Sequence, residues 1–268
     1  MKKYFFFLLL FTSVNAQKLN NLHSPENIKL FADHLFSEKD FLRAALEYEK
    51  LPEDDSINFK IALSYQAIEK YDAALDRFAK INYESNLYHI SQHQYFKTLL
   101  LSEQHDVLQR KIIISENTDY QKYLYISYLF TSDKLPGKDE FLKSFPSNEK
   151  VELSFFYEKK KNPPYKSSLT AGLLSALIPG SGKIYTGRIG DGITSFITVS
   201  LLSFLSYNNF TNDHDFRGWL FAGLGFFFYA GNIYGSAVSA EIYNSQVDYQ
   251  FQKKLKEYLE QKNYFISE

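Results

Sequence analysis

The sequence predicts an all-α protein, in which a short solenoid of helical repeats is followed by an α-helical membrane hairpin. Three observations lead to this fold class. A pattern of seven residues recurs at a fixed offset near the N-terminus. Residues 24–160 contain a single glycine, Gly137, and their apolar residues recur at the three- and four-residue spacings of amphipathic helices. Further on, a glycine-dense segment lies between apolar runs that are long enough to enter a bilayer.

The first sixteen residues have the features of a secretory signal peptide. Lys2 and Lys3 are basic, residues 4–11 are apolar, and Val14-Asn15-Ala16 ends in the small residues that signal peptidase prefers. An uncleaved anchor is the alternative, but a span of the bilayer needs roughly 20 apolar residues. We therefore expect residues 1–16 to be a signal peptide that is cleaved before Gln17, and the mature chain to be exported.

Two segments align with each other, and the shared positions are those that matter where two helices pack. The first segment has Phe31, Ala32, Leu35, Phe41, Ala44, Tyr48 and Leu51. The second has Ile61, Ala62, Tyr65, Tyr71, Ala74, Phe78 and Ile81. A small residue lets two helices cross closely, and a large aromatic residue fills the gap one turn later. The pattern indicates a repeated helix-turn-helix unit.

This unit resembles the tetratricopeptide repeat, whose small-residue positions correspond to Ala32, Ala44, Ala62 and Ala74. The period of that family is about 34 residues, and the copy here is shorter at Pro52-Glu53-Asp54-Asp55. The resemblance covers residues 24–81, and residues 84–130 continue as helices with a degraded motif. The resemblance implies a helical-repeat domain over residues 17–160.

The resemblance also implies a concave groove, lined by the first helix of each repeat, that binds a segment of a partner protein. Carried over position by position, the groove would present Lys29, Asp33, Phe36, Phe59, Leu63 and Gln66. The alternative for Phe36, Phe59 and Leu63 is that they are core contacts, because large apolar side chains on repeat helices are often buried against the next helix.

Composition and motifs argue against catalysis and against nucleic acid. The formal net charge of −1 offers no clustered excess of lysine and arginine for phosphates. There is no cysteine, which excludes a thiol enzyme and a cysteine metal site. His89 and His93 have the four-residue spacing of a metal pair, but no third ligand is evident. We expect no enzyme activity, no cofactor and no metal.

The sequence Lys159-Lys160-Lys161-Asn162-Pro163-Pro164 closes the N-terminal half. Prolines stop a helix, so residues 161–167 are predicted to be a short linker. Next to a bilayer, the three lysines would also suit anionic lipid head groups.

Residues 168–243 are predicted to form a membrane hairpin. Its two spans are expected at 192–207 and 218–240, and the shorter apolar segment at 169–178 is expected to be interfacial or re-entrant. Gly231 and Gly235 would let another helix approach closely, either the first span or a second copy of the chain. Residues 244–268 read as an amphipathic helix that lies on the membrane or docks on the repeats.

The glycine-dense segment presents Pro179, Gly180, Gly182, Tyr185, Gly187 and Gly192. A phosphate-binding P-loop is disfavoured, because Ile184 follows Lys183 where that motif needs serine or threonine. The segment resembles the bacterial two-transmembrane-helix domain family, in which a glycine-rich turn precedes the first span. That family implies an architecture and no catalytic residue.

The order of signal peptide, repeats, linker and hairpin leads to a functional hypothesis. We expect a membrane-anchored scaffold or adaptor of the bacterial envelope, fixed in the inner membrane, whose exported periplasmic repeats bind a partner protein. The alternative is an accessory subunit of a membrane transport, secretion or insertion machine that acts through the hairpin and its glycine-rich turn. A homo-oligomer remains open under both.

Overall fold

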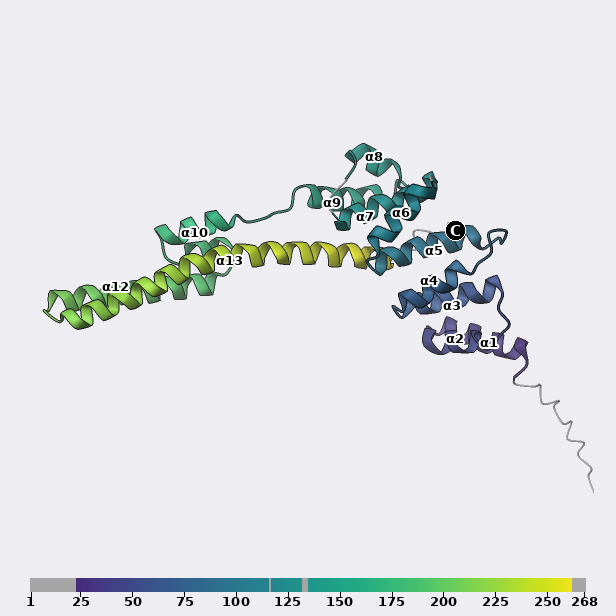
Figure 1. Cartoon of the computed structure of the whole chain (residues 1–268), viewed down its shortest axis with the longest axis horizontal. Coiled ribbons are helices and arrows are strands. Elements are labelled where there is room, and N and C mark those ends of the chain that lie inside the picture. The colour runs from purple at the N-terminus through teal and green to yellow at the C-terminus, as the bar shows by residue number, and fades with distance from the viewer. Residues whose placement is uncertain (1–22, 116, 132–134, 262–268) are drawn as a thin grey trace, which may run out of the picture. The chain divides into compact units, whose positions relative to one another are not determined.

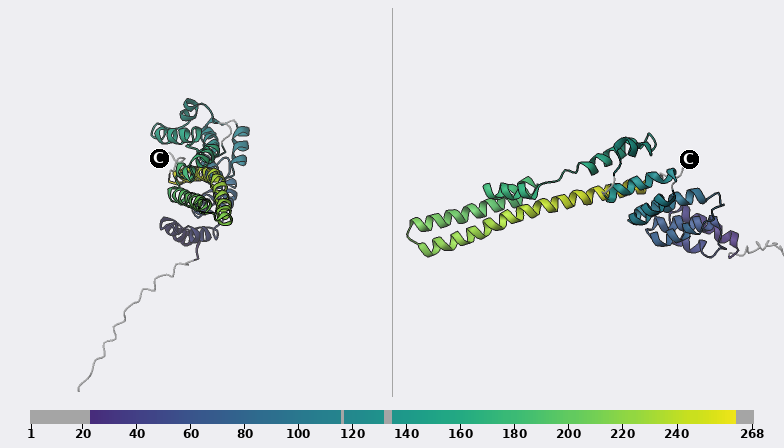
Figure 2. Two further views of the ribbon diagram at one scale, coloured as in Figure 1. Left: turned by 90° about the vertical axis from the view of Figure 1, so that its left-hand side faces the viewer. Right: turned by 45° about the horizontal axis from the view of Figure 1, so that its top comes forward.

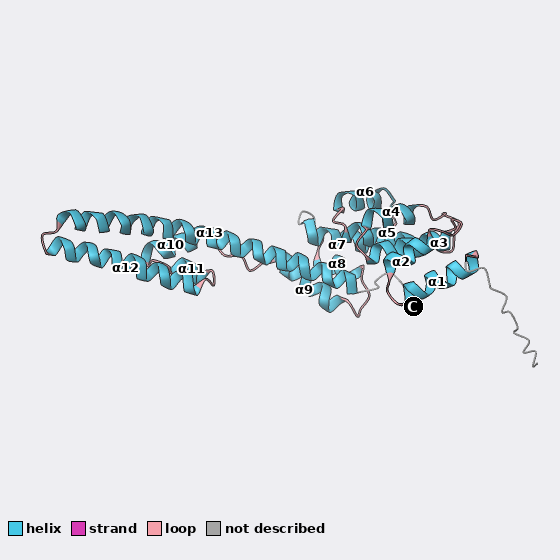
Figure 3. Ribbon diagram, turned by 90° about the horizontal axis from the view of Figure 1, so that it is seen from below, coloured by secondary structure: helices cyan, strands magenta, loops and turns pink. Residues whose placement is uncertain are grey.

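Helices form nearly all of the regular structure. The computed structural model describes residues 23–115, 117–131 and 135–261, and within them it contains helices and no strand (Figure 3). This confirms the all-α fold class, while the expected signal peptide at 1–16 lies outside the described residues. The chain divides between Ile114 and Ser115 into two compact units. The expected repeat domain, residues 17–160, spans that division.

The first unit consists of helices in consecutive pairs (Figure 1). They are α1 (Pro25–Ser37), α2 (Phe41–Tyr48), α3 (Asp55–Ala67), α4 (Tyr71–Ala79), α5 (Tyr88–Leu101) and α6 (His105–Ser115). Side-chain caps start several of them: Ser24 accepts from the backbone N–H of Asn27, and Asp54 accepts from that of Ile57. These caps satisfy N–H groups that a helix leaves unpaired at its beginning.

One turn geometry recurs within all three pairs. Lys39, Glu69 and Glu103 lie between paired helices and have φ of 62°, 60° and 60°. In each turn the next residue donates its backbone N–H to a carbonyl five residues earlier, as from Asp40 to Leu35 at 2.9 Å. This left-handed residue is a standard helix ending. The third pair therefore repeats the first two, although its sequence motif is weak.

The repeated small residues occupy the places that the alignment assigned to them. Ala32, Ala44, Ala62 and Ala74 are fully buried, as are the aromatic residues Tyr48 and Phe78. Two positions differ: Phe31 is half exposed while its counterpart Ile61 is buried, and Leu35 is buried while its counterpart Tyr65 is partly exposed. The third pair has Phe96 and Leu108 where the earlier pairs have alanine. Those larger residues explain why the pattern fades after residue 81.

The second unit begins with short helices and ends with two long ones. They are η1 (Thr118–Tyr120), α7 (Gln121–Thr131), α8 (Lys138–Lys143), α9 (Lys150–Lys161), α10 (Ser168–Leu177), α11 (Ser181–Tyr185), α12 (Ile189–Thr211) and α13 (Asp215–Gln261). We expected the hairpin to end at 243 and a separate helix to follow. Instead, α13 is continuous for 47 residues, because neither glycine nor proline interrupts it after Gly235.

The C-terminal part of α13 docks on α9. The ring of Phe156 lies 5.3 Å from that of Tyr258 and 6.0 Å from that of Phe251, centroid to centroid. Leu255 and Leu259 are fully buried. Of the two expected positions for this segment, the structure shows docking on a helix that the sequence assigned to the repeat domain.

Helices α12 and α13 run antiparallel side by side (Figures 1 and 2). Their close approach depends on a glycine, since a Cβ on Gly218 would lie 2.6 Å from the ring of Phe210. Among the described residues, α12 is the one helix long and apolar enough to cross a membrane. The other expected span, 218–240, does not meet that measure, because Asn232 and several tyrosines and glycines lower its hydropathy.

Candidate functional site

Polar side chains gather at two places in the second unit. The first is the glycine corner, residues 178–192, where α10, α11 and α12 meet against α13. The second is a groove between α9 and α13.

Helix α10 leads into the glycine corner alongside α13, and the chain then reverses its direction along α13. The hydroxyl of Tyr229 donates to the carbonyl of Ala176 at 2.6 Å, so the end of α10 lies beside the middle of the hairpin. After α11, the guanidinium of Arg188 donates to Ser239 at 3.3 Å, ten residues further along α13. Helices α10 and α11 therefore form a turned-back pair that packs against α13 (Figure 2).

Glycine is required at all four of the predicted corner glycines, including Gly192, where a Cβ would lie 2.7 Å from the carbonyl oxygen of Gly180. Gly180 has φ of 86°, and a Cβ there would lie 1.9 Å from the carbonyl oxygen of Gly192. A Cβ on Gly182 would lie 1.9 Å from the carbonyl oxygen of Ala171. Gly187 has φ of 88° but open space around it. The corner therefore holds backbone segments closer together than any side chain would allow.

Hydroxyl groups satisfy the backbone of the corner. Ser175 Oγ accepts from the backbone N–H of Gly182 at 2.9 Å and lies 2.7 Å from Ser236 Oγ on α13. Ser181 Oγ lies 2.6 Å from the carbonyl oxygen of Leu174. These serines therefore supply hydrogen-bond partners to backbone groups where the chain turns between α10 and α11.

Other residues in or near the corner make contacts through their side chains. Pro179 is half-buried. The ammonium of Lys166 lies 4.5 Å from the centre of the Tyr185 ring, a cation–π contact. Arg188 pairs with Asp191 at 2.6 Å.

A cavity of about 280 Å³, which we call the corner cavity, lies between α11, α12 and α13. Lys183 and Asn232 line it, and Lys183 donates to Ser195 Oγ at 2.8 Å. The sequence pattern singled out the glycines around this cavity and missed Asn232. A buried asparagine within an apolar run is a signal that could have identified it.

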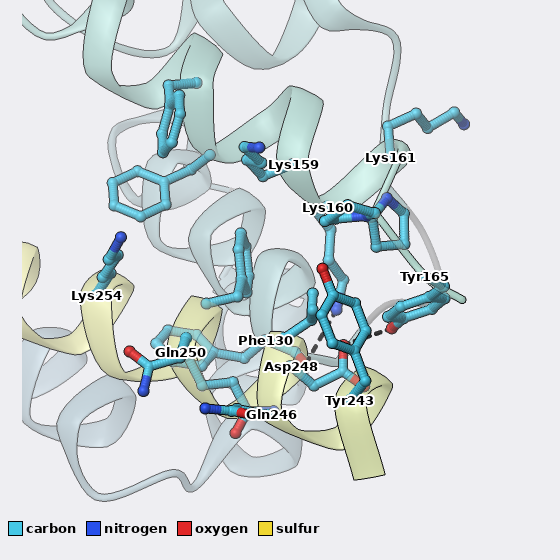
Figure 4. A pocket seen from close by; sticks show the side chains of 17 residues that line it. Phe130, Lys159, Lys160, Lys161, Tyr165, Tyr243, Gln246, Asp248, Gln250 and Lys254 are labelled. Atoms are coloured by element: carbon cyan, nitrogen blue, oxygen red, sulfur yellow. Dashed lines mark hydrogen bonds between the residues drawn. The ribbon is translucent and has the colours of Figure 1, made fainter. Parts of the chain in front are cut away.

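The second polar site is the larger, at about 840 Å³, and we call it the basic groove (Figure 4). Lys159, Lys160 and Lys161 reach it from α9, and Lys254 reaches it from α13. The lining also includes aromatic side chains, and Lys160 Nζ lies 5.7 Å from the centre of the Phe251 ring. The groove therefore combines excess positive charge with apolar walls, which suits an anionic amphiphile.

One carboxylate, that of Asp248, lines the basic groove. It accepts a hydrogen bond from the hydroxyl of Tyr165 (Figure 4). That bond, together with burial, raises the pKa of Tyr165 to about 12. The linker that carries Tyr165 is held further by Asn244, which bonds both the N–H and the carbonyl of Lys166 at 2.7 and 2.9 Å.

The two charged residues of the predicted partner groove in the first unit, Lys29 and Asp33, form ion pairs. Lys29 Nζ lies 3.4 Å from Asp33, which also accepts from the Tyr48 hydroxyl at 2.5 Å and lies 3.7 Å from Lys60. Burial raises the pKa of Asp33, but the bonds from Tyr48 and Lys29 outweigh it and hold the pKa below its usual value. Lys29 itself remains exposed.

The other four predicted groove residues contact neighbouring helices. Phe36 packs on the core of the first pair, and Phe59 and Leu63 pack on that of the second. Gln66 donates to Thr98 Oγ1 at 2.8 Å and so ties α3 to α5. These contacts match the alternative that the apolar members are core residues, and they give Gln66 an internal role.

Neither of the two glycines expected to pack helices lies at the close approach of α12 to α13. Gly231 is exposed, and nothing in the described part of the chain lies within 4 Å of a Cβ built on it. Gly235 approaches the side chain of Lys183, 3.6 Å from its Cε. Gly218 takes the close approach between α12 and α13 instead.

His89 and His93 lie on one face of α5, with ring centroids 4.5 Å apart. His93 is buried and His89 is exposed. No group of three or more metal-binding side chains occurs among the residues that the structure describes.

Within the part of the chain that the structure describes, these features define an all-helical protein with one helix long and apolar enough to cross a membrane and a polar corner beside it. The chain is similar to the uncharacterized protein MJ1516 of the archaeon Methanocaldococcus jannaschii, with 33% identity over 86 residues. The match takes up 31% of this chain and 80% of the archaeal protein. The chain belongs to the same family as that protein. No family model matches the chain, and no solved structure matches it.

Proposed function

We propose that this protein is a membrane-anchored adaptor of the bacterial envelope. In this proposal α10–α13 lie in the inner membrane, and the helical pairs α1–α6 are exported to the periplasm, where they bind a partner protein. The first unit would then be the binding domain and the second unit the anchor.

The observation that carries the proposal is the apolar surface of the α12–α13 hairpin. Large apolar side chains on both helices are at least 40% exposed, among them Ile193, Ile197, Leu201, Phe204, Trp219, Leu220, Phe226 and Phe227. Soluble proteins rarely expose so continuous an apolar surface. Helix α12 is 23 residues long, or about 34 Å at 1.5 Å per residue, which matches the apolar core of a bilayer.

The contacts of α13 also support two crossings rather than one. Phe156 precedes the hairpin in the chain, Phe251 follows it, and their rings are 6.0 Å apart. Residues before and after the hairpin therefore lie on the same side of it. If α12 crosses the bilayer, α13 must return, despite its lower hydropathy. Asn232 is buried within the protein and so does not face lipid on the way.

Partner binding by the first unit is supported by its likeness to tetratricopeptide repeats. The buried alanines, the fully buried Tyr48 and Phe78, and the recurring left-handed turn are what such repeats need to stack. Of the predicted groove residues, Lys29 is the one whose side chain is more than half exposed. We therefore place the partner-binding face on α1 and α3 around Lys29.

The anchor is tested by placing a charge at the middle of α12. Leu201→Lys should move the full chain from the membrane to the soluble fraction, because a central lysine costs about 2.5–3.5 kcal/mol on insertion. Ile113→Lys is the matched control, since Ile113 is also exposed but lies in the first unit. Equal carbonate extraction of both variants and of the wild type would contradict the membrane anchor.

The partner face is tested by photo-crosslinking from two lysines of equal exposure. Lys29 lies on α1 and Lys50 follows α2, with side chains 53% and 56% exposed, and each pairs with an acid on its own segment. A photoreactive residue at position 29 should capture a defined protein in cells, while one at position 50 should not. Equal capture at both positions would reject this face.

A second function is favoured by the glycine corner. A re-entrant helix pair beside a membrane span, with Lys183 and Asn232 at its centre, is more than an anchor requires. It supports an accessory subunit of a membrane transport, secretion or insertion machine that acts through the hairpin. In that case crosslinks should form from the corner, at Thr194, and should survive substitutions around Lys29.

A further inference from the structure

The corner cavity contains an amide without a hydrogen-bond partner. Asn232 on α13 is 4% exposed, and neither Oδ1 nor Nδ2 has a partner within the described part of the chain. Buried amides are nearly always paired, and an unpaired one in an apolar environment is costly. This side chain therefore points to a ligand that supplies the missing bonds.

The same cavity contains an unmatched positive charge. Lys183 donates to Ser195 Oγ at 2.8 Å, and no carboxylate pairs with it among the residues that the structure describes. The acid nearest in sequence, Asp191, pairs with Arg188 at 2.6 Å. A buried or membrane-embedded ammonium is stabilised by an anionic partner, so the ligand carries a group that can be negative.

The depth of the cavity excludes the ordinary position of a lipid head group. Ser195 and Thr198 line it, and they lie six and nine residues beyond the start of α12 at Ile189. At 1.5 Å per residue this is about 9–14 Å below the end of the helix. The lipid phosphates lie at the edge of a hydrocarbon core about 30 Å thick. A side chain on a second transmembrane helix can lie at the depth of Ser195 and Thr198, whereas a lipid phosphate lies closer to the bilayer surface.

The rim of the cavity is shaped for a helix. Gly231 is exposed, with nothing within 4 Å of an added Cβ in the described part of the chain, and Thr194 across the cavity is exposed as well. Small residues at such a surface let the backbone of a second helix approach closely. The chain itself leaves this strip uncovered by any described helix.

We propose that the corner cavity binds a membrane-spanning helix of a partner protein that carries an aspartate or glutamate at the depth of Lys183. The carboxyl group accepts hydrogen bonds from Lys183 Nζ and Asn232 Nδ2, and in its protonated form it also donates to Asn232 Oδ1. Gly231 and Thr194 accommodate the backbone of that helix. This inference rests on the membrane insertion proposed above, and it names the chemistry of a second partner for the hairpin.

The test uses the full chain in phosphatidylcholine vesicles with synthetic peptides. Each peptide is a leucine-rich helix of roughly 20 residues with glutamate, glutamine or leucine at its centre and an acceptor fluorophore at one end. Binding is followed by energy transfer from Trp219, the only tryptophan of the chain. The glutamate peptide should bind about 10-fold more tightly than the leucine peptide, since buried charged hydrogen bonds exceed the average interhelical bond.

Two variants connect that preference to the cavity. Lys183→Gln and Asn232→Leu should each remove most of the preference for glutamate. Lys254→Gln removes a lysine from the basic groove and should leave the preference unchanged.

Flotation of the vesicles separates the two proposals. If the chain does not float with the vesicles, the membrane anchor fails, and this inference fails with it. If the chain floats but all three peptides bind alike, or Lys183→Gln behaves as the wild type, the cavity does not recognise a carboxyl group. If phosphatidylglycerol in the vesicles abolishes glutamate binding through Lys183, the occupant is a lipid head group and the inference is overturned.

Discussion

Replacing Gly182 by alanine should force α10 and α11 apart. A Cβ at this position would lie 1.9 Å from the carbonyl oxygen of Ala171 and 2.8 Å from Ser175 Oγ. Ala171 O belongs to the backbone of α10, so no side-chain rotation relieves the contact. We expect about 1–3 kcal/mol from overpacking and about 1 kcal/mol more from the bond between Gly182 N–H and Ser175 Oγ. The total loss is roughly 2–4 kcal/mol.

The single tryptophan makes this loss measurable in the full chain. Trp219 packs against Phe210 at 5.4 Å between centroids, near the turn from α12 to α13. Its fluorescence in detergent micelles therefore reports the integrity of the hairpin during thermal or denaturant unfolding. The Gly182→Ala transition should occur at clearly lower temperature and denaturant concentration than that of the wild type.

A second glycine provides the control. Gly190 lies in the first turn of α12, and nothing described lies within 4 Å of a Cβ built there. Because alanine favours helix more than glycine does, Gly190→Ala should be neutral or stabilising by up to about 1 kcal/mol. If Gly182→Ala and Gly190→Ala unfold together, the close contact between α10 and α11 is not what holds the corner, and the reasoning is refuted.

Three further predictions concern buried polar groups. Tyr48→Phe should lower the stability of the first unit by about 1–2 kcal/mol, because the bond to the Asp33 carboxylate is lost; a denaturant midpoint equal to that of the wild type would contradict this. Ser236→Ala removes one of the two partners of the buried Ser175 hydroxyl, the other being the Gly182 N–H, and should cost about 1–3 kcal/mol in the fluorescence assay, whereas the exposed Ser245→Ala should cost nothing measurable. Burial lowers the pKa of His105 more than Glu103 and Asp106 raise it, so the unfolded chain binds the proton more readily. Stability should therefore fall as the pH drops below about 6.5, and His105→Gln should reduce the difference between denaturant midpoints at low and neutral pH.

Much of the fold could be predicted from local signals. Ser24 and Asp54 start helices where their side chains cap the first turn, and the fixed offset between Ala44 and Ala74 gave the first two helix pairs. The third pair was harder, because Phe96 and Leu108 replace the small residues while the left-handed turn at Glu103 is kept. Backbone geometry persisted there after the residue pattern had changed.

The candidate site was predicted only in part, because its contacts join segments that are not neighbours in the sequence. Gly180 and Gly182 were identified because glycine clusters indicate unusual backbone. Gly192 was identified too, but its close approach to Gly180 and that of Ala171 to Gly182 could not be predicted, because both depend on how α11 packs between α10 and α12. The repeat pattern assigned Phe59 and Gln66 of α3 to the same groove as Lys29 of α1. In the structure Phe59 contacts α4 and Gln66 contacts α5.

The sequence by itself determined the helical class, the order of the segments and the positions of the corner glycines, because these follow from periodicity and from local backbone sterics. Tertiary structure alone decided that α13 continues to Gln261 and docks on α9. It also decided that Ser175, Lys183 and Asn232 meet at one corner. Such meetings join residues far apart in the chain, 61 positions for Ser175 and Ser236, and no local propensity encodes a contact that exists only after the helices have packed.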